Sequence, residues 1–172
     1  YSNIKQKLDE DLFNNNWTEV NTKIIPKKKI DLNFIDLFSG AGGLSLGFQD
    51  AGFNKIASFE IDKDASATIE KNFKNSIHIK DDITQVTNNK LSKIFGKKKI
   101  DIICGGPPCQ GFSVAGYRNP NDKRNLLFRE YLRFLKFFKP KIFMLENVPG
   151  ILTMSDGNVK NIMMNEFEKL GY

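Results

Sequence analysis

Five short apolar runs follow one another along the chain from Asn33 onward, and longer amphipathic stretches separate them. Each run is closed by Gly, Asp or Pro, as expected of a strand that lies inside a sheet covered on both faces. The runs are NFIDLF (33–38), KIASFE (55–60), IHIK (77–80), KIDIIC (99–104) and KIFMLE (141–146).

The stretches between and after these runs have apolar residues at helical spacing. We expect helices over residues 43–51, 63–72, 87–95, 125–138 and 159–170. Strands that alternate with helices predict a parallel sheet with helices on both faces, and right-handed crossovers then give a doubly wound α/β fold. Ligands of such folds bind at the carboxyl ends of the strands.

The chain divides into an extension and one domain. Residues 1–32 have few periodic apolar positions and include the segment KIIPKKK, so we expect an N-terminal extension with a basic linker. Residues 33–172 are enough for one compact domain. The sequence contains neither a secretory signal nor an apolar stretch of roughly 18 residues, so a cytoplasmic protein without a membrane span is expected.

Charge and cysteine content narrow the choice of partners. The chain has 26 Lys and Arg against 20 Asp and Glu, a net charge of +6, which favours an anionic partner such as nucleic acid but also fits an ordinary basic surface. Cys104, Cys109 and the single His78 cannot supply the four ligands of a zinc site, so we expect free thiols and no metal.

A glycine-rich loop, FSGAGGLSLGF, follows the first apolar run. Gly40, Gly42 and Gly43 let the backbone turn sharply and approach a ligand, although a turn without any ligand explains them about as well. A nicotinamide fingerprint would need Gly at position 45, where this chain has Ser45. Glu60 ends the second run at the interval at which an acid binds ribose hydroxyls, so a nucleoside-bearing cofactor is indicated.

Three acidic residues after the second and third runs have local alternatives. We expect Asp62 to cap the helix that begins at Lys63. Either Asp81 or Asp82 could accept a hydrogen bond from an adenine amino group, or could simply cap the next helix, and spacing does not decide between these roles.

The fourth and fifth runs lead into the most reactive residue types. Pro107 and Pro108 stiffen the approach to Cys109, which favours a nucleophilic thiol held in a fixed position, whereas Cys104 inside the apolar run is expected to be buried and inert. Glu146 ends the last run, where burial would raise its pKa and suit it to donate a proton, although a capping role is also open.

These stretches, in this order, resemble the cytosine-5 DNA methyltransferases of bacterial restriction-modification systems. The resemblance is carried by FIDLFSGAGGLSLGF, FEID, DDIT, GGPPCQGFS and ENVPG, between Phe34 and Gly150. It implies a mostly parallel, Rossmann-like sheet of the S-adenosylmethionine-dependent methyltransferase type, here truncated before its last strands. It also implies that the enzyme flips a cytosine out of duplex DNA.

The resemblance assigns roles to individual residues. Cys109 would add to C6 of the cytosine to form a covalent intermediate, and Glu146 would act at N3. The implied S-adenosylmethionine contacts are Phe38, Ser39, Gly40, Gly42, Gly43, Glu60, Ile61, Asp82, Ile83 and Pro108. The implied substrate contacts are Pro108, Gln110, Ser113, Asn147, Val148, Arg118 and Arg124, of which the two arginines belong to a mobile loop that contacts phosphates.

The resemblance also implies parts that this chain does not contain. Members of the family continue with a Gln-x-Arg-x-Arg segment, a target-recognition region and a terminal helix. We therefore expect these 172 residues alone to transfer no methyl group, and we expect a complementing chain or the remainder of the same protein to complete the site.

Three alternative functions remain open. A tRNA cytosine methyltransferase would have a very similar site, but Pro-Phe usually follows its Cys-Gln, whereas this chain has Gly111 and Phe112. A regulatory relative without catalysis should have lost Cys109 or Glu146, and both are present. A nicotinamide oxidoreductase with a catalytic cysteine is disfavoured by the glycine loop.

Overall fold

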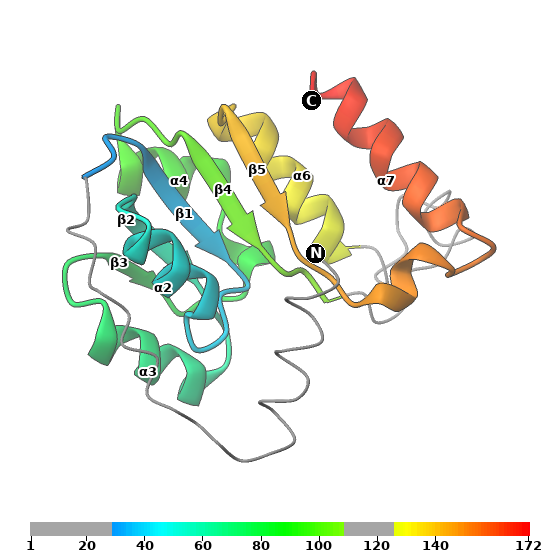
Figure 1. The fold of residues 1–172 in the computed structure, drawn as a ribbon. Coiled ribbons are helices and arrows are strands. Elements are labelled where there is room, and N and C mark those ends of the chain that lie inside the picture. Colours follow the sequence, from blue (N-terminus) through cyan, green and yellow to red (C-terminus); the bar gives the residue numbers. More distant parts are fainter. Residues whose placement is uncertain (1–28, 109–125) are drawn as a thin grey trace, which may run out of the picture.

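The computed structural model describes residues 29–108 and 126–172, and these residues form one parallel sheet with flanking helices (Figure 1). The strand order is β3-β2-β1-β4-β5, and every pairing is parallel. The five expected apolar runs are the five strands, so the predicted α/β fold is confirmed. The strands are β1 (Asn33–Leu37), β2 (Asn54–Phe59), β3 (Ile77–Ile79), β4 (Ile102–Gly105) and β5 (Ile142–Leu145).

The helices also lie where the periodicity predicts them. Asp62 accepts hydrogen bonds from the backbone N–H groups of Asp64 and Ala65, which confirms its capping role, and the Thr87 hydroxyl accepts one from the Lys90 N–H. The helices are α2 (Gly43–Asp50), α3 (Lys63–Asn72), α4 (Asn88–Phe95), α6 (Leu126–Phe138) and α7 (Asn158–Lys169), with short 3₁₀ helices η1 (Ile83–Gln85) and η3 (Pro149–Leu152).

The helices cover the two faces of the sheet unequally. In Figure 1, α2 lies in front of the sheet, whereas α4 and α6 lie behind it. The larger core cluster lies on the α4 and α6 side, and a smaller cluster of Phe34, Ile102 and Cys104 packs beneath Leu44 and Phe48 on the α2 side. Cys104 is therefore buried, as its place in an apolar run predicts.

A β-bulge in β2 changes which side chains share a face. Phe34 of β1 pairs with Lys55, but the next residue, Ile35, pairs with Ala57, so Ile56 is an extra residue in β2. A one-residue shift turns the side chains before it to the opposite face. Lys55 therefore lies on the same face of the sheet as Phe34, beneath α2, rather than in the larger core.

β5 differs from the other strands because it lies at the edge of the sheet. Its burial alternates, and Ile142 and Met144 are 57% and 37% exposed, whereas every residue of β4 is buried. α7 covers the opposite face of β5, where the rings of Phe143 and Phe167 lie 4.4 Å apart. In the part of the chain that the structure describes, the outer edge of β5 has no strand beside it.

Candidate functional site

A cavity of about 320 Å³ lies at the carboxyl ends of β1, β2 and β4, where the strand order reverses and ligands of doubly wound folds bind. We call it the Glu60 cavity. It is lined by Phe38, Phe59, Glu60, Ile61, Asp81, Asp82, Ile83, Gly106, Pro108 and Leu127. Six of the ten residues that the sequence assigns to the cofactor are among them.

The Glu60 carboxylate is held by two backbone N–H groups. Oε2 accepts a hydrogen bond from Gly40 N at 2.7 Å, and Oε1 accepts one from Asp62 N at 2.8 Å. The bond to Gly40 joins the end of β2 to the glycine loop after β1. Since each carboxylate oxygen can accept two hydrogen bonds, Glu60 is oriented and can still accept hydrogen bonds from two ligand hydroxyls.

The glycine loop is shaped as much by packing as by its place beside the cavity. Gly42 has φ of 95°, caps α2, and has so little space that a Cβ would lie 2.7 Å from the Phe73 ring. Ser39 fastens the loop to β2, because its N–H donates to Phe59 O at 3.1 Å. Gly40 and Gly43 have open space instead. Among the described residues that line the cavity, none comes from positions 39 to 43.

Beneath this loop, the buried Asp36 on β1 is fixed to helix α2. The Ser45 hydroxyl donates to Asp36 Oδ2 at 2.6 Å, which ties α2 to the strand that leads into the glycine loop. Burial raises the pKa of Asp36, and the hydrogen bond from Ser45 partly offsets this effect. Burial likewise raises the pKa of the Cys104 thiol, which fits an unreactive structural cysteine.

Asp81 and Asp82 both line the cavity but have different contacts. Asp82 Oδ1 accepts hydrogen bonds from the backbone N–H and the hydroxyl of Thr84, at 2.9 and 2.8 Å, and so caps η1. Asp81 forms an ion pair with Lys90 on α4. Asp82 is thus held rigidly with its second oxygen uncommitted, whereas Asp81 is tied to a surface lysine.

Glu146 and Asn147, at the end of β5, contact the Gly106–Pro108 segment that lines the cavity. A Cβ on Gly106 would lie 2.9 Å from Glu146 Oε2, so glycine at this position leaves room for the carboxylate beside the β4 loop. Asn147 Nδ2 donates to Pro107 O at 2.9 Å, which joins the end of β5 to the Pro-Pro segment. Val148 N–H donates to Asn147 Oδ1 at 2.9 Å, so the amide cannot rotate freely.

The expected burial of Glu146 is wrong. Glu146 is exposed, because β5 is the edge strand and no described residue covers the end of this strand on its open side. The substrate residue Val148 is also 55% exposed. The remaining predicted residues, Cys109, Gln110, Ser113, Arg118 and Arg124, lie outside the described residues.

The sequence analysis did not assign three residues that line the cavity, Phe59, Gly106 and Leu127. It left a fourth, Asp81, as one of two alternatives. Gly106 had a usable signal, because a second glycine before two prolines indicates a close approach of another group. Leu127 belongs to the apolar face of α6, and nothing in its spacing distinguishes it from the core residues of that helix.

Comparison with known proteins identifies the family. The family model described as C-5 cytosine-specific DNA methylase matches residues 32–172. The chain belongs to this family. This confirms the resemblance carried by the motifs after the strands.

Curated members of the C-5 methylase family include two similar relatives. The type II methyltransferase M1.HphI of Haemophilus parahaemolyticus is 41% identical over 83% of this chain. The type II methyltransferase M.DdeI of Desulfomicrobium norvegicum is 46% identical over 82% of it. The matched regions cover 39% and 34% of those two proteins, so the chain spans little more than a third of their length.

Solved structures agree with the fold. A putative DNA modification methyltransferase of E. coli encoded within a prophage is 40% identical, with a TM-score of 0.68 over 80% of this chain and 38% of its own. A DNMT2 variant of Spodoptera frugiperda has a TM-score of 0.61 at 23% identity, over 81% of this chain and 41% of its own, and this likeness concerns the fold alone.

Residues 29–108 and 126–172 contain neither a cluster of metal ligands nor a helix that could span a membrane. No three His, Cys, Asp or Glu side chains there lie close enough together to hold a metal ion. Likewise, none of the helices in these ranges combines the length and apolar character needed to cross a membrane.

Proposed function

We propose that this chain is the catalytic part of an enzyme that transfers a methyl group from S-adenosylmethionine to C5 of cytosine in duplex DNA. The observation that carries the proposal is that the Glu60 cavity and the Glu146 carboxylate both lie at the carboxyl ends of the strands. The Glu60 cavity and the Glu146 carboxylate lie on either side of the Gly106–Pro108 segment. Cys109 follows Pro108 directly in the chain.

The residues of the Glu60 cavity fit S-adenosylmethionine. Glu60 would accept hydrogen bonds from the two ribose hydroxyls, and Asp82 would accept one from the adenine amino group. Ile61 and Ile83 offer apolar surface to the adenine ring, and Phe38 offers it to the methionine side. When bound, the cofactor supplies an electrophilic methyl group on a sulfonium sulfur. Family membership supports this choice of cofactor.

In the proposed mechanism Cys109 and Glu146 make C5 of cytosine nucleophilic. The Cys109 thiolate adds to C6, which forms an S–C6 bond and moves electron density to C5 and N3. Glu146 holds a proton at N3 and so stabilises the adduct. After C5 has gained the methyl group, a base removes the C5 proton and the thiolate leaves C6, which restores the aromatic ring.

Asn147 would act by positioning Glu146 rather than by reacting. Its amide is fixed to Pro107 O and to Val148 N, so the end of β5 keeps a constant position relative to the Pro-Pro segment. A fixed approach matters because small displacements of a catalytic group reduce the rate strongly.

Duplex DNA is the proposed substrate, with the target cytosine flipped out of the stack. The net charge of +6 supports a polyanionic partner, and Arg118 and Arg124 are the proposed phosphate contacts, with Gln110 and Ser113 nearer the base. The family description and the names of the type II relatives favour DNA over tRNA.

The base side of the site is proposed to be completed by further polypeptide. The exposed Ile142 and Met144 lie on the open face of β5. On the opposite face, a groove of about 590 Å³ is lined by Phe143, Leu145 and residues of η3 and α7, as far as Tyr172. Apolar surface of this extent favours cover by another element. We therefore infer that the remainder of the protein, or a complementing chain, packs here, and that residues 1–172 alone are inactive.

The test is a methylation assay on the full-length protein. Transfer of a labelled methyl group from S-adenosylmethionine to duplex DNA is expected, with C5-methylcytosine as the product after digestion. Transfer to tRNA but not to DNA would favour the RNA-modifying alternative. Binding of S-adenosylmethionine without transfer to either nucleic acid would favour a regulatory relative.

The activity of residues 1–172 is tested in the same assay. No transfer is expected from this chain alone, because the base side of its site is open. Full transfer to duplex DNA by the 172-residue chain would contradict the need for further polypeptide.

A further inference from the structure

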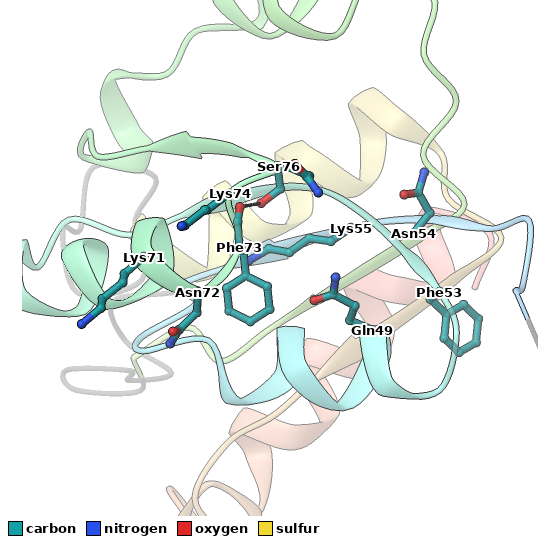
Figure 2. A pocket seen from close by; sticks show the side chains of 10 residues that line it. Gln49, Phe53, Asn54, Lys55, Lys71, Asn72, Phe73, Lys74 and Ser76 are labelled. Carbon is teal, nitrogen blue, oxygen red and sulfur yellow. Dashed lines mark hydrogen bonds between the residues drawn. The ribbon is translucent and has the colours of Figure 1, made fainter. Parts of the chain in front are cut away.

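A second cavity, of about 420 Å³, lies at the amino ends of β2 and β3, so it is at the opposite ends of the strands from the Glu60 cavity (Figure 2). We call it the lysine pocket. It is lined by Gln49, Phe53, Asn54, Lys55, Lys71, Asn72, Phe73, Lys74, Asn75 and Ser76. Three of these residues are lysines and none is acidic, so the pocket has a positive potential. The two cavities are remote from each other, because the amino ends of parallel strands lie on one side of the sheet and the carboxyl ends on the other.

Lys55 carries the unusual feature of this pocket. The residue is 6% exposed, and within the described ranges its Nζ has no hydrogen-bond partner. The ammonium group lies 3.7 Å from the centre of the Phe73 ring, and Figure 2 shows the side chain running along the pocket toward that ring, with Gln49 beside it. A buried ammonium without an acceptor is costly, so an anion that enters this pocket relieves an existing penalty.

The surroundings of Lys55 only partly compensate its charge. Burial lowers the pKa of Lys55 to about 8, whereas the nearby Asp36 carboxylate favours the charged form. Asp36 Oδ2 is already bonded to Ser45, and Oδ1 is not within hydrogen-bond distance of Lys55. The ammonium therefore retains its capacity to donate hydrogen bonds toward the pocket.

The mouth of the pocket adds further donors. Lys71 and Lys74 are exposed, and in the described part of the chain neither forms an ion pair, whereas Lys80 nearby pairs with Glu70. The side-chain amides of Asn72 and Asn75 likewise have no hydrogen bond to described residues, so they too can donate to a ligand.

We propose that the lysine pocket binds a small phosphate-bearing anion, with its phosphate group on the Lys55 ammonium and its remaining charge at Lys71 and Lys74. Ammonium groups bind phosphate as point charges, and three of them suit an anion with more than one negative charge. Because Nζ is buried beside the Phe73 ring, a small terminal phosphate can approach it more closely than the backbone of duplex DNA can. S-adenosylmethionine does not fit, because its sulfonium and ammonium groups would meet three lysines and no carboxylate.

The test is isothermal titration of the full-length protein with inorganic phosphate and with pyrophosphate. Lys55→Met, which keeps an unbranched side chain but removes the ammonium group, is expected to weaken pyrophosphate binding about tenfold or more. The double variant Lys71→Gln/Lys74→Gln is expected to weaken it several-fold. Lys93→Gln, which removes one positive charge from the exposed side of α4, serves as the matched control and should leave the affinity unchanged.

Several results would overturn the proposal. Unchanged pyrophosphate affinity in both pocket variants would do so, as would an equal loss in Lys93→Gln, which would reveal a nonspecific charge effect. If the variants weaken binding of a duplex oligonucleotide but not of pyrophosphate, the pocket is a nucleic-acid contact instead. If Lys55→Met does not fold, the surface double variant decides the question by itself.

Discussion

The Glu60 side and the Glu146 side of the site, both at the carboxyl ends of the strands, differ in how far their residues are buried and hydrogen bonded. On the Glu60 side, both carboxylate oxygens are hydrogen bonded and Ile83 is 5% exposed. On the Glu146 side, the carboxylate and Val148 are exposed, and Asn147 donates a hydrogen bond to Pro107 O. The first side is built on the central strands, and the second on an edge strand. In the described residues, the Glu60 side is therefore ordered by the central strands, whereas the proposed base side remains open.

The largest expected effect comes from Cys109, the proposed nucleophile. Cys109→Ser in the full-length protein should reduce methyl transfer by roughly 10³-fold or more, since a hydroxyl near neutral pH is a far weaker nucleophile than a thiolate. S-adenosylmethionine affinity, measured by calorimetry, should change little because the Glu60 side is independent of it. Retained turnover would refute the role of Cys109.

A fluorinated substrate tests the same step directly. When fluorine replaces hydrogen at C5 of the target cytosine, the final proton loss is blocked, so the wild-type enzyme should remain covalently attached to DNA. Cys109→Ser should form no such adduct. Cys104→Ala is the matched control, because that thiol is buried in the sheet and should be dispensable for adduct formation.

The next prediction compares how much stability is lost when a side chain is truncated on the Glu60 side and on the Glu146 side. Ile83→Ala removes a buried side chain from the larger core and should lower the free energy of unfolding by about 2–4 kcal/mol. Val148→Ala should change it by less than about 0.5 kcal/mol, because that side chain is exposed. Chemical denaturation of the 172-residue chain measures both. Equal losses would mean that the open side is as well packed as the other.

In the full-length protein, the difference between the stability losses of Ile83→Ala and Val148→Ala should be smaller. If the remaining polypeptide covers the open side, Val148→Ala should cost more stability there than in the isolated chain, since burial increases the cost of truncation. An unchanged small cost would argue that nothing packs over Val148.

A smaller effect is expected at Glu60 itself. Glu60→Gln keeps the shape but removes the charge that strengthens hydrogen bonds to ribose hydroxyls, so the Kd for S-adenosylmethionine should rise about tenfold. Asp62→Asn is the control, because asparagine caps a helix as well as aspartate and the Asp62 N–H that bonds Glu60 is retained. A tenfold loss in both variants would point to a change of the loop rather than to ribose binding.

The sequence predicts the Glu60 side better than the Glu146 side, and the reason is physical. Alternating apolar runs and caps such as Asp62 are local signals, and they place strands and helices within a residue or two. The carboxyl ends of parallel strands then meet at one edge whatever the details of packing, which is why Glu60, Asp82 and Pro108 could be brought together in advance.

Burial at an edge is not a local property. The pattern of KIFMLE resembles that of a fully buried strand, but β5 is half exposed because it is the edge strand of the described sheet. The bulge at Ile56 could not be predicted from the sequence either, since it depends on how β2 pairs with β1. As a result, the sequence analysis did not identify the burial of Lys55. The close packing of Gly42 against Phe73 likewise depends on tertiary structure.

The smallest effect concerns the strand beneath the Glu60 side, where β2 begins with Lys55. The pKa of Lys55 is about 8 in the folded protein against an ordinary value of 10.5, so between these pH values the unfolded chain binds more protons than the folded one. Stability should therefore rise with pH across this window, relative to Lys55→Met, which lacks the titration. Solvent screening at the pocket mouth keeps the change on the order of 1 kcal/mol.

The groups around Lys55 define the control for this experiment. Asp36 of β1, Cys104 of β4 and His78 of β3 interact with its charge. Burial raises the pKa of Asp36 and lowers that of His78. Burial raises the pKa of Cys104 beyond the window. Unfolding curves at several pH values, taken as the difference between the wild type and Lys55→Met, isolate the lysine. A difference that does not change with pH would mean that the ammonium stays charged, which would require a closer acceptor than Asp36.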